Sequence, residues 1–72
     1  MKNLIKIDGV VLEALPNVQF IVELEDKQHI RCYLSGRMNL NHIKVMIGDK
    51  VSIEVSPNME IKNQVGRIVL RK

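Results

Sequence analysis

Five short stretches of this sequence place apolar residues at every second position, and that period limits the fold more than any other feature. Side chains two residues apart lie on the same face of a β-strand, so such a stretch buries one face and exposes the other. The clearest example is 18–25, in which Val18, Phe20, Val22 and Leu24 alternate with mostly polar residues. The five predicted strands are 4–12, 18–25, 28–35, 51–56 and 66–72.

The segments between these strands predict how the strands are arranged. Turn residues stand at Leu15–Asn17 (LPN) and Asp26–Lys27, and 58–64 reads as a polar loop. Five strands in 72 residues are too few for two packed sheets, whereas a closed barrel gives every strand an inner face. The insert at 35–50 falls where the five-stranded OB-fold barrel has its connecting helix. We therefore predict one all-β domain over residues 1–72, an OB-fold barrel with a short helix between strands three and four.

The same alternation predicts which residues line the inside of the barrel. Gly9 lies within the first strand, where a glycine usually marks a bulge or a sharp bend. Phe20 and Cys32 belong to the apolar faces of their strands, so both are expected in the core. The expected inner residues are Ile5, Ile7, Val11, Val18, Phe20, Val22, Leu24, Ile30, Cys32, Leu34, Val51, Ile53, Val55, Ile68 and Leu70.

The insert, SGRMNLNHIKVMIGDK, has apolar residues at helical spacing. Leu40, Ile43 and Ile47 fall at positions i, i+3 and i+7, a narrow stripe suited to covering one end of a barrel. Ser35 is placed to cap the N-terminus of this helix, and Gly48 is placed to end it. The insert is therefore predicted to be a helix that plugs the barrel.

A polar stripe runs beside this apolar one. Arg37, Asn41 and Lys44 fall at i, i+4 and i+7, on an adjacent face of the predicted helix. This face is either a solvated helix surface or a binding surface. Three further apolar residues lie outside the plug stripe, and apolar groups beside cations on an exposed segment favour contact with a partner or a base. They are Met38, Val45 and Met46.

The charge balance is mildly basic, with eleven Lys and Arg, eight Asp and Glu, a net charge of +3 and a pI near 9.3. Acids gather at Glu23, Glu25 and Asp26, whereas 66–72 carries three cations and no acid. The single cysteine excludes an intramolecular disulfide and favours a reducing compartment. The sequence shows neither a signal-peptide pattern nor an apolar run long enough to span a membrane. We expect a soluble, cytoplasmic protein with no membrane contact.

Few residues are suited to catalysis. Cys32, His29, His42 and Ser35 are the only candidates for a nucleophile or base, and Cys32 is expected to be a buried structural thiol. His29 follows a turn and is expected to be a solvated side chain. No zinc-ligand spacing, glycine-rich phosphate loop or carboxylate pair is present. We expect no enzyme activity, no metal and no cofactor.

The distribution of cations favours nucleic acid as the partner, because OB-type barrels bind it through cations on phosphates and aromatic side chains under bases. Tyr33 alternates outward, where it either stacks on a base or is plain surface. Phe20 and Tyr33 are the only aromatic residues, so structured RNA fits this surface better than a splayed single strand. Arg67 and Arg71 are expected on one face of the last strand. The cations concerned are Arg31, Arg37, Lys44, Lys50, Arg67 and Arg71.

Four blocks of the sequence resemble bacterial-type translation initiation factor one. They are LPNVQFIVELE at 15–25, YLSGRM at 33–38, GDKVSIEVSP at 48–57 and GRIVLR at 66–71. The blocks span nearly the whole chain and follow the order of the family. The family has a five-stranded OB barrel that is similar to the S1 RNA-binding module, which agrees with the fold predicted above.

The resemblance implies a protein that binds the small ribosomal subunit at the decoding (aminoacyl-tRNA) site. Its partners would be the long penultimate helix of the 16S-type rRNA, a neighbouring rRNA loop, a small-subunit protein and the other two initiation factors. It would act as a monomer, keep elongator tRNA out and support start-site selection. The RNA-binding residues carried over by position are Arg37, Asn41, His42, Lys44, Arg67 and Arg71, and Arg31, Tyr33, Lys50 and Lys62 are further candidates.

The chain departs from the family pattern at several positions. Asn39 and Leu40 stand where the family carries more positive charge, and His42 stands where a tyrosine is common. The loop 58–65 is longer than usual and lacks a cation directly before its glycine, for which Lys62 is expected to substitute. These departures indicate a divergent homologue, either from the cytoplasm of a bacterium or from a plastid stroma.

Two other functions stay open on sequence grounds. A generic S1-like or cold-shock-like RNA-binding module would bind free single-stranded RNA equally well, and the low number of aromatic residues disfavours it. A barrel that binds protein would use either the acidic residues Glu23, Glu25 and Asp26 or the methionine-bearing insert. Charge reversal at Arg67 and Arg71 would leave the binding of such a barrel to its partner intact.

Overall fold

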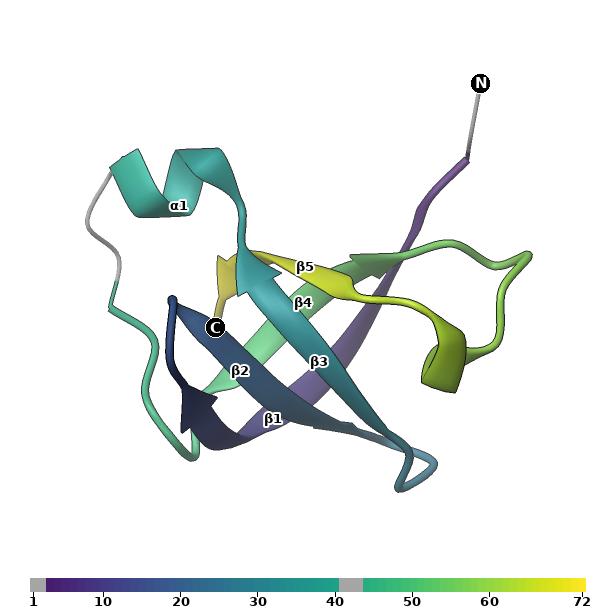
Figure 1. Ribbon diagram of the computed structural model, residues 1–72, viewed down its shortest axis with the longest axis horizontal. Helices are drawn as coiled ribbons and strands as arrows, with labels where there is room; N and C mark the ends of the chain where they lie inside the picture. Colours follow the sequence, from purple (N-terminus) through teal and green to yellow (C-terminus); the bar gives the residue numbers. More distant parts are fainter. Residues whose placement is uncertain (1–2, 41–43) are drawn as a thin grey trace.

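The structure is a computed structural model, and it describes residues 3–40 and 44–72. The described chain forms a closed barrel in the strand order β1-β2-β3-β5-β4, with α1 at one end (Figure 1). Neighbouring strands are antiparallel, except that β3 and β5 run parallel. The predicted all-β OB-fold barrel with a short helix between the third and fourth strands is confirmed. The elements are β1 (Ile5–Leu15), β2 (Gln19–Leu24), β3 (His29–Leu34), α1 (Gly36–Leu40), β4 (Lys50–Val55), the 3₁₀-helix η1 (Ile61–Asn63) and β5 (Gly66–Arg71).

Alternate residues of all five strands fill the barrel, as the period-two pattern predicts. Most of the expected inner residues are buried, and Val22, Cys32 and Ile53 are fully enclosed. Ile5 and Val18 are wrong predictions, with exposed fractions of 44% and 52%. Val18 belongs to the turn before β2 and has a positive φ of 57°, whereas Ile5 pairs with β4 alone at the open start of β1. The alternation pattern therefore gave a wrong inner position at Val18, which precedes β2, and at Ile5, where β1 has one neighbouring strand.

Gly9 is required by a close approach of two strands. It pairs with Leu24 of β2 on one side and with Val51 of β4 on the other. A Cβ at this position would lie 2.5 Å from Val22 Cγ1 and 2.7 Å from the Glu23 carbonyl oxygen. The bulge considered for Gly9 occurs farther along β1, where the register shifts between Val11 and Glu13.

A second register shift, in β5, reverses two predictions. Ile68 pairs with Ile53 and Leu70 pairs with Ser52, so β5 has one residue, Val69, in excess. An extra residue turns the following side chains to the opposite face. Leu70 therefore points outward and is 51% exposed, contrary to the predicted inner position.

The same bulge separates Arg67 from Arg71, which alternation placed on one face. Arg67 pairs with Glu54 on the outer face of the sheet, whereas Arg71 pairs with Val51, whose side chain is buried in the barrel. Arg71 lies at the last position of β5, so its side chain leaves through the barrel end. The side chains of Arg67 and Arg71 therefore lie on different surfaces of the barrel.

The insert plugs the barrel, but through residues other than those predicted. Met38 is 1% exposed and Val45 is 8% exposed, and both belong to the core. Leu40 and Ile47, two members of the predicted plug stripe, are 80% and 65% exposed, and the third, Ile43, lies outside the described residues.

The physical reason is that helical spacing applies to only a small part of the insert. Within the described residues α1 spans Gly36–Leu40, which is little more than one turn. Ser35 caps it as predicted, since its Oγ accepts a hydrogen bond from the Met38 amide (3.3 Å). Gly48 does not end this helix; it lies in the turn before β4 with a φ of 93°. No helix of the described part of the chain is long and apolar enough to cross a membrane.

Met38 is predicted to be the main anchor of α1. Met38→Ala should lower the free energy of unfolding by about 2–5 kcal/mol, because it leaves a cavity in the core. Leu40→Ala, on the same short helix, should change it by less than about 0.5 kcal/mol. Urea unfolding followed by circular dichroism measures both values. If Met38→Ala does not fold, Met38→Leu, which nearly conserves volume, should cost less than about 1.5 kcal/mol. Equal effects at Met38 and Leu40 would contradict this placement of the plug.

Cys32 predicts a loss of stability in alkali. Burial raises the pKa of the Cys32 thiol to about 12, whereas the same thiol in the unfolded chain has a pKa of about 8.5. Between these values the unfolded state binds fewer protons than the folded state, so the free energy of unfolding falls as the pH rises. Cys32→Ala should lower stability at neutral pH but show a shallower alkaline decline than the wild type. Parallel declines in the two proteins would refute the burial of an ionisable thiol.

Candidate nucleic-acid interface

Three of the predicted RNA-binding residues lie on α1, on the segment that leads to β4 and at the end of β5. Arg37 is exposed on α1, which contacts β5, and Lys44 is exposed on the segment that leads to β4. Arg71 donates a hydrogen bond from Nη1 to the Lys44 carbonyl oxygen (2.8 Å), which ties the end of β5 to that segment. We call this group, Arg37, Lys44 and Arg71, the α1 end. Asn41 and His42, which were predicted to bind RNA with them, lie outside the described residues.

The α1 end carries positive charge that the described chain does not neutralise. None of its three cations forms an ion pair with an acidic side chain in residues 3–40 or 44–72. Exposed apolar groups adjoin it in sequence: Leu40, Met46 and Ile47 are each more than half exposed. Unpaired cations beside exposed apolar groups suit contact with phosphates and the bases attached to them.

Arg67 and Tyr33 occupy the outer face of the sheet. They are partners in the parallel register of β3 and β5, and Tyr33 is 43% exposed. Arg67 donates from Nη2 to Glu54 Oε1, and this hydrogen bond raises the pKa of Arg67 above its ordinary value. The Nε of Arg67 is buried without an acceptor in the described residues. Arg67 is therefore oriented by Glu54, and the negative charge of that carboxylate weakens the attraction of Arg67 for a phosphate.

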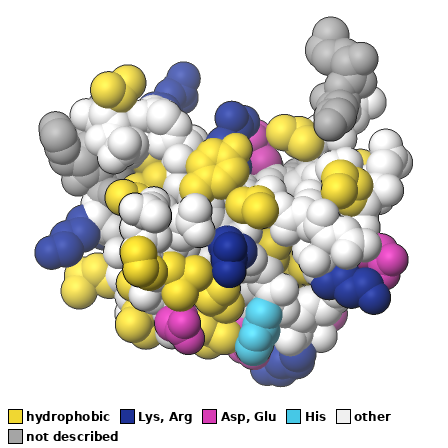
Figure 2. All heavy atoms as spheres, in the orientation of Figure 1, with side chains coloured by type: hydrophobic (Ala, Val, Ile, Leu, Met, Phe, Trp, Pro, Cys, Tyr) yellow, Lys and Arg dark blue, Asp and Glu magenta, His cyan; other side chains and the backbone are white. Residues whose placement is uncertain are grey.

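The remaining predicted RNA-binding residues lie at two separate hollows of the surface. Arg31, on the outer face of β3, and Lys62, on η1, line one hollow together with His29. Figure 2 shows one face of the molecule, on which separate cationic side chains lie among apolar and acidic ones. Lys50 stands apart, because it lines a hollow of mixed charge with Asp8 and Glu23.

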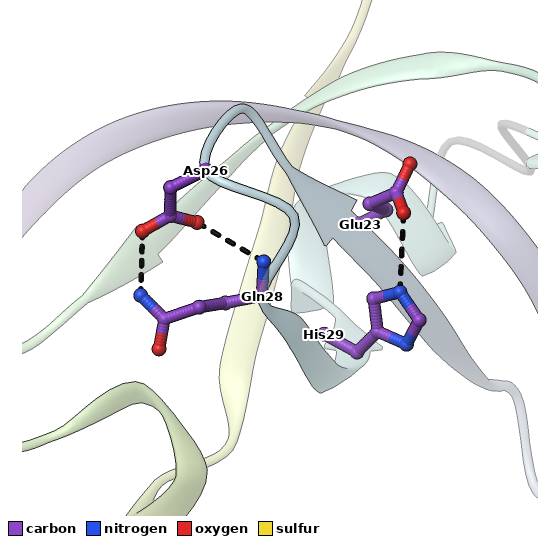
Figure 3. Close-up of polar contacts among 4 residues, drawn as sticks. All are labelled: Glu23, Asp26, Gln28 and His29. Atoms are coloured by element: carbon purple, nitrogen blue, oxygen red, sulfur yellow. Dashed lines mark hydrogen bonds and ion pairs between the residues drawn. The ribbon is translucent and has the colours of Figure 1, made fainter.

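Two of the acidic residues at the β2–β3 hairpin, Glu23 and Asp26, form local polar contacts (Figure 3). Asp26 accepts hydrogen bonds from the Gln28 side chain (2.5 Å) and backbone (3.1 Å), which lower the pKa of Asp26. Glu23 lies 3.2 Å from His29 Nε2. These contacts join the turn of the hairpin to itself and link β2 to β3. No group of three or more metal-ligating side chains occurs within the described ranges.

Sequence reasoning missed how the loop between β4 and β5 is held. Gln64 accepts a hydrogen bond from the Ser56 amide (2.8 Å) and donates to the carbonyl oxygens of Ser56 (3.0 Å) and Met59 (3.1 Å). Ile61 is partly buried and packs against the core. A lone glutamine and a lone isoleucine in a polar segment show no periodicity, so the only available signal was the apolar character of Ile61.

A closed OB barrel whose described surface carries unpaired cations and an exposed tyrosine is typical of the oligonucleotide-binding class of proteins. The sequence profile of the family translation initiation factor 1A / IF-1 (eIF-1a) matches residues 2–72. The chain belongs to this family and is a translation initiation factor.

Two solved structures are similar to this barrel. The solution structure of translation initiation factor one from the Wolbachia endosymbiont strain TRS of Brugia malayi superimposes with a TM-score of 0.77 at 33% identity, covering 96% of this chain and 78% of that one. The crystal structure of YjeQ from Thermotoga maritima gives a TM-score of 0.73 at 26% identity, covering 94% of this chain but only 23% of that one. The barrel therefore corresponds to most of the first protein and to a small part of the second.

Gln64→Ala is predicted to loosen the loop between β4 and β5. Loss of its three hydrogen bonds should cost about 1–3 kcal/mol in the free energy of unfolding. The more specific readout is hydrogen exchange by NMR, in which the Ser56 amide should lose its protection. Asn63→Ala is the matched control, since Asn63 is exposed on the same loop. An unchanged exchange rate at Ser56 would show that Gln64 does not hold this loop in solution.

Proposed function

We propose that this initiation factor binds the small ribosomal subunit at the decoding (aminoacyl-tRNA) site. By occupying that site it keeps elongator tRNA out and supports the other two initiation factors in start-site selection. The family assignment supports this proposal. The structural observation that carries it is the unpaired positive charge of the α1 end in the described chain. Three cations without acidic partners in the described chain provide charge for rRNA phosphates at one end of a small, closed barrel.

Each residue of the proposed site has a role in this binding. Arg37, Lys44 and Arg71 contact phosphates of the long penultimate rRNA helix. Asn41 and His42, which come between Arg37 and Lys44 in the sequence, contact bases by hydrogen bonding or stacking. Five further candidates lie outside the α1 end: Arg31, Tyr33, Lys50, Lys62 and Arg67, of which Arg67 is already paired with Glu54.

In this proposal the protein works by binding alone. It acts as a monomer and as a single domain, without catalysis, metal or cofactor, in a bacterial cytoplasm or a plastid stroma. A small-subunit protein beside the decoding site completes the contact surface. The exposed apolar residues Leu40, Met46 and Ile47 are suited to that protein contact, because they adjoin the cations of the α1 end.

Charge reversal at the α1 end tests the proposal. Arg37→Glu combined with Lys44→Glu should abolish co-sedimentation with purified small subunits at low salt. For the wild type, three phosphate contacts predict a loss of roughly 40-fold in affinity between about 50 and about 200 mM salt, because counterions are released on binding. Chemical probing of the subunit rRNA should show protection of decoding-region bases by the wild type and none by the double variant.

The matched control reverses two cations elsewhere. Lys6 and Lys27 are exposed and form no ion pair in the described chain, so Lys6→Glu with Lys27→Glu changes the net charge equally. This control should retain binding and the protection pattern. If both double variants lose binding alike, only net charge matters and the assigned site is wrong. If the wild type stays unbound at low salt, the proposed function itself is wrong.

A further inference from the structure

A groove starts beside the β2–β3 hairpin, at the end of the barrel away from α1, and continues along β1 (Figure 1). It consists of two hollows that share three lining residues, so one hollow continues into the other: Asp8, Leu24 and Glu25. We call the two hollows together the hairpin groove. The cations of the α1 end line neither hollow, and decoding-site binding assigns no role to this groove.

The first hollow is lined by apolar side chains of the barrel end. Leu24 belongs to the core, and the other two apolar residues, Ile7 and Ile61, pack against the core. The hollow has a volume of about 270 Å³, which is below the roughly 300 Å³ at which pockets for small molecules begin. It therefore suits one apolar side chain better than a whole small-molecule ligand.

Three acidic side chains border the same hollow, and no cation lines it within the described residues. Asp8 is paired with Lys72 (2.6 Å), which lowers the pKa of Asp8 and neutralises its charge. Asp26 accepts hydrogen bonds from the neutral Gln28, and neither Asp26 nor Glu25 forms an ion pair with a described residue. Two negative charges therefore remain beside the apolar hollow, where they attract a cation.

The second hollow carries charges of both signs. Its charged lining residues are three acids and three lysines: Asp8, Glu23, Glu25, Lys27, Lys50 and Lys72. Carboxylates accept hydrogen bonds from backbone amides, and lysine side chains donate hydrogen bonds to backbone carbonyls. A lining that offers both kinds of group, without net charge, suits an extended polypeptide backbone.

We propose that the hairpin groove binds a segment of a partner protein in which an arginine or lysine adjoins an apolar residue. The apolar side chain enters the first hollow, the cationic side chain pairs with Glu25 and Asp26, and the backbone continues into the second hollow. RNA is disfavoured because the two unpaired carboxylates repel phosphates, and a polyamine would leave the apolar hollow unfilled. This binding goes beyond decoding-site binding and does not depend on it.

NMR of the isotope-labelled full chain, titrated with the peptide acetyl-Gly-Leu-Arg-Arg-Gly-amide at low salt, tests the proposal. The backbone amides of Leu24, Glu25 and Ile61 should shift in a saturable way, whereas those of Arg37 and Lys44 should not. A peptide with serine in place of leucine should bind about tenfold more weakly, because it buries no apolar side chain. Glu25→Gln should weaken binding of the leucine peptide about two- to fivefold, the usual effect of an exposed ion pair.

Glu13→Gln is the matched control, since Glu13 is an exposed acid outside both hollows and forms no ion pair in the described chain. It should leave the affinity close to that of the wild type. Equal weakening by Glu25→Gln and Glu13→Gln would overturn the proposal, as would equal binding of the serine and leucine peptides. Stronger shifts of the groove amides with spermine or hexauridylate would also overturn it. Shifts that grow with protein concentration in the absence of peptide would make the occupant a second copy, again contrary to the proposal. Co-sedimentation with small subunits is independent of each of these outcomes.

Discussion

β1 determines the closure of the barrel, because it hydrogen-bonds to β2 along one edge and to β4 along the other. The two sets of pairs overlap at Gly9 and Val10, where β2 approaches so closely that no side chain fits at Gly9. With β1 held on both edges, the sheet can close only by pairing β3 with β5. That parallel pairing is what places Tyr33 beside Arg67 on the outer surface. The arrangement of these two side chains therefore follows from a backbone contact on the other side of the barrel.

Much of the fold was predictable because each strand has one buried face. The period-two pattern correctly predicted the inner positions of Phe20, Cys32 and Ile53. The prediction failed at Leu70 because a bulge at Val69 changes the facing of all later residues, and a bulge leaves no mark in apolar alternation. It failed in the insert because its described residues comprise a short helix and a segment without regular secondary structure, so no single period applies. Met38 lies on the helix, and Val45 lies on the irregular segment.

The candidate site was predictable in its residue types but not in its grouping. Exposure of Arg31 and Tyr33 followed from alternation and is confirmed. The partner of Arg67 was not predictable, because the register between β4 and β5 decides which acid lies opposite, and one sequence does not reveal register. The division of Arg67 and Arg71 between two surfaces has the same origin. The one extra residue in β5 thus places Arg67 and Arg71 in different environments. Arg67 is neutralised by a carboxylate, and Arg71 donates a hydrogen bond to a backbone carbonyl.

Ile61 belongs to a surface loop and yet helps to close the barrel end opposite α1, where it borders a hollow with Ile7 and Leu24. Surface loops commonly tolerate insertion and deletion because their length has a small effect on folding free energy. That tolerance does not extend to this loop, since a change in its length would withdraw Ile61 and admit water to the barrel end. Shortening this loop should therefore destabilise the barrel, unless larger side chains at Ile7 or Leu24 fill the space that Ile61 leaves.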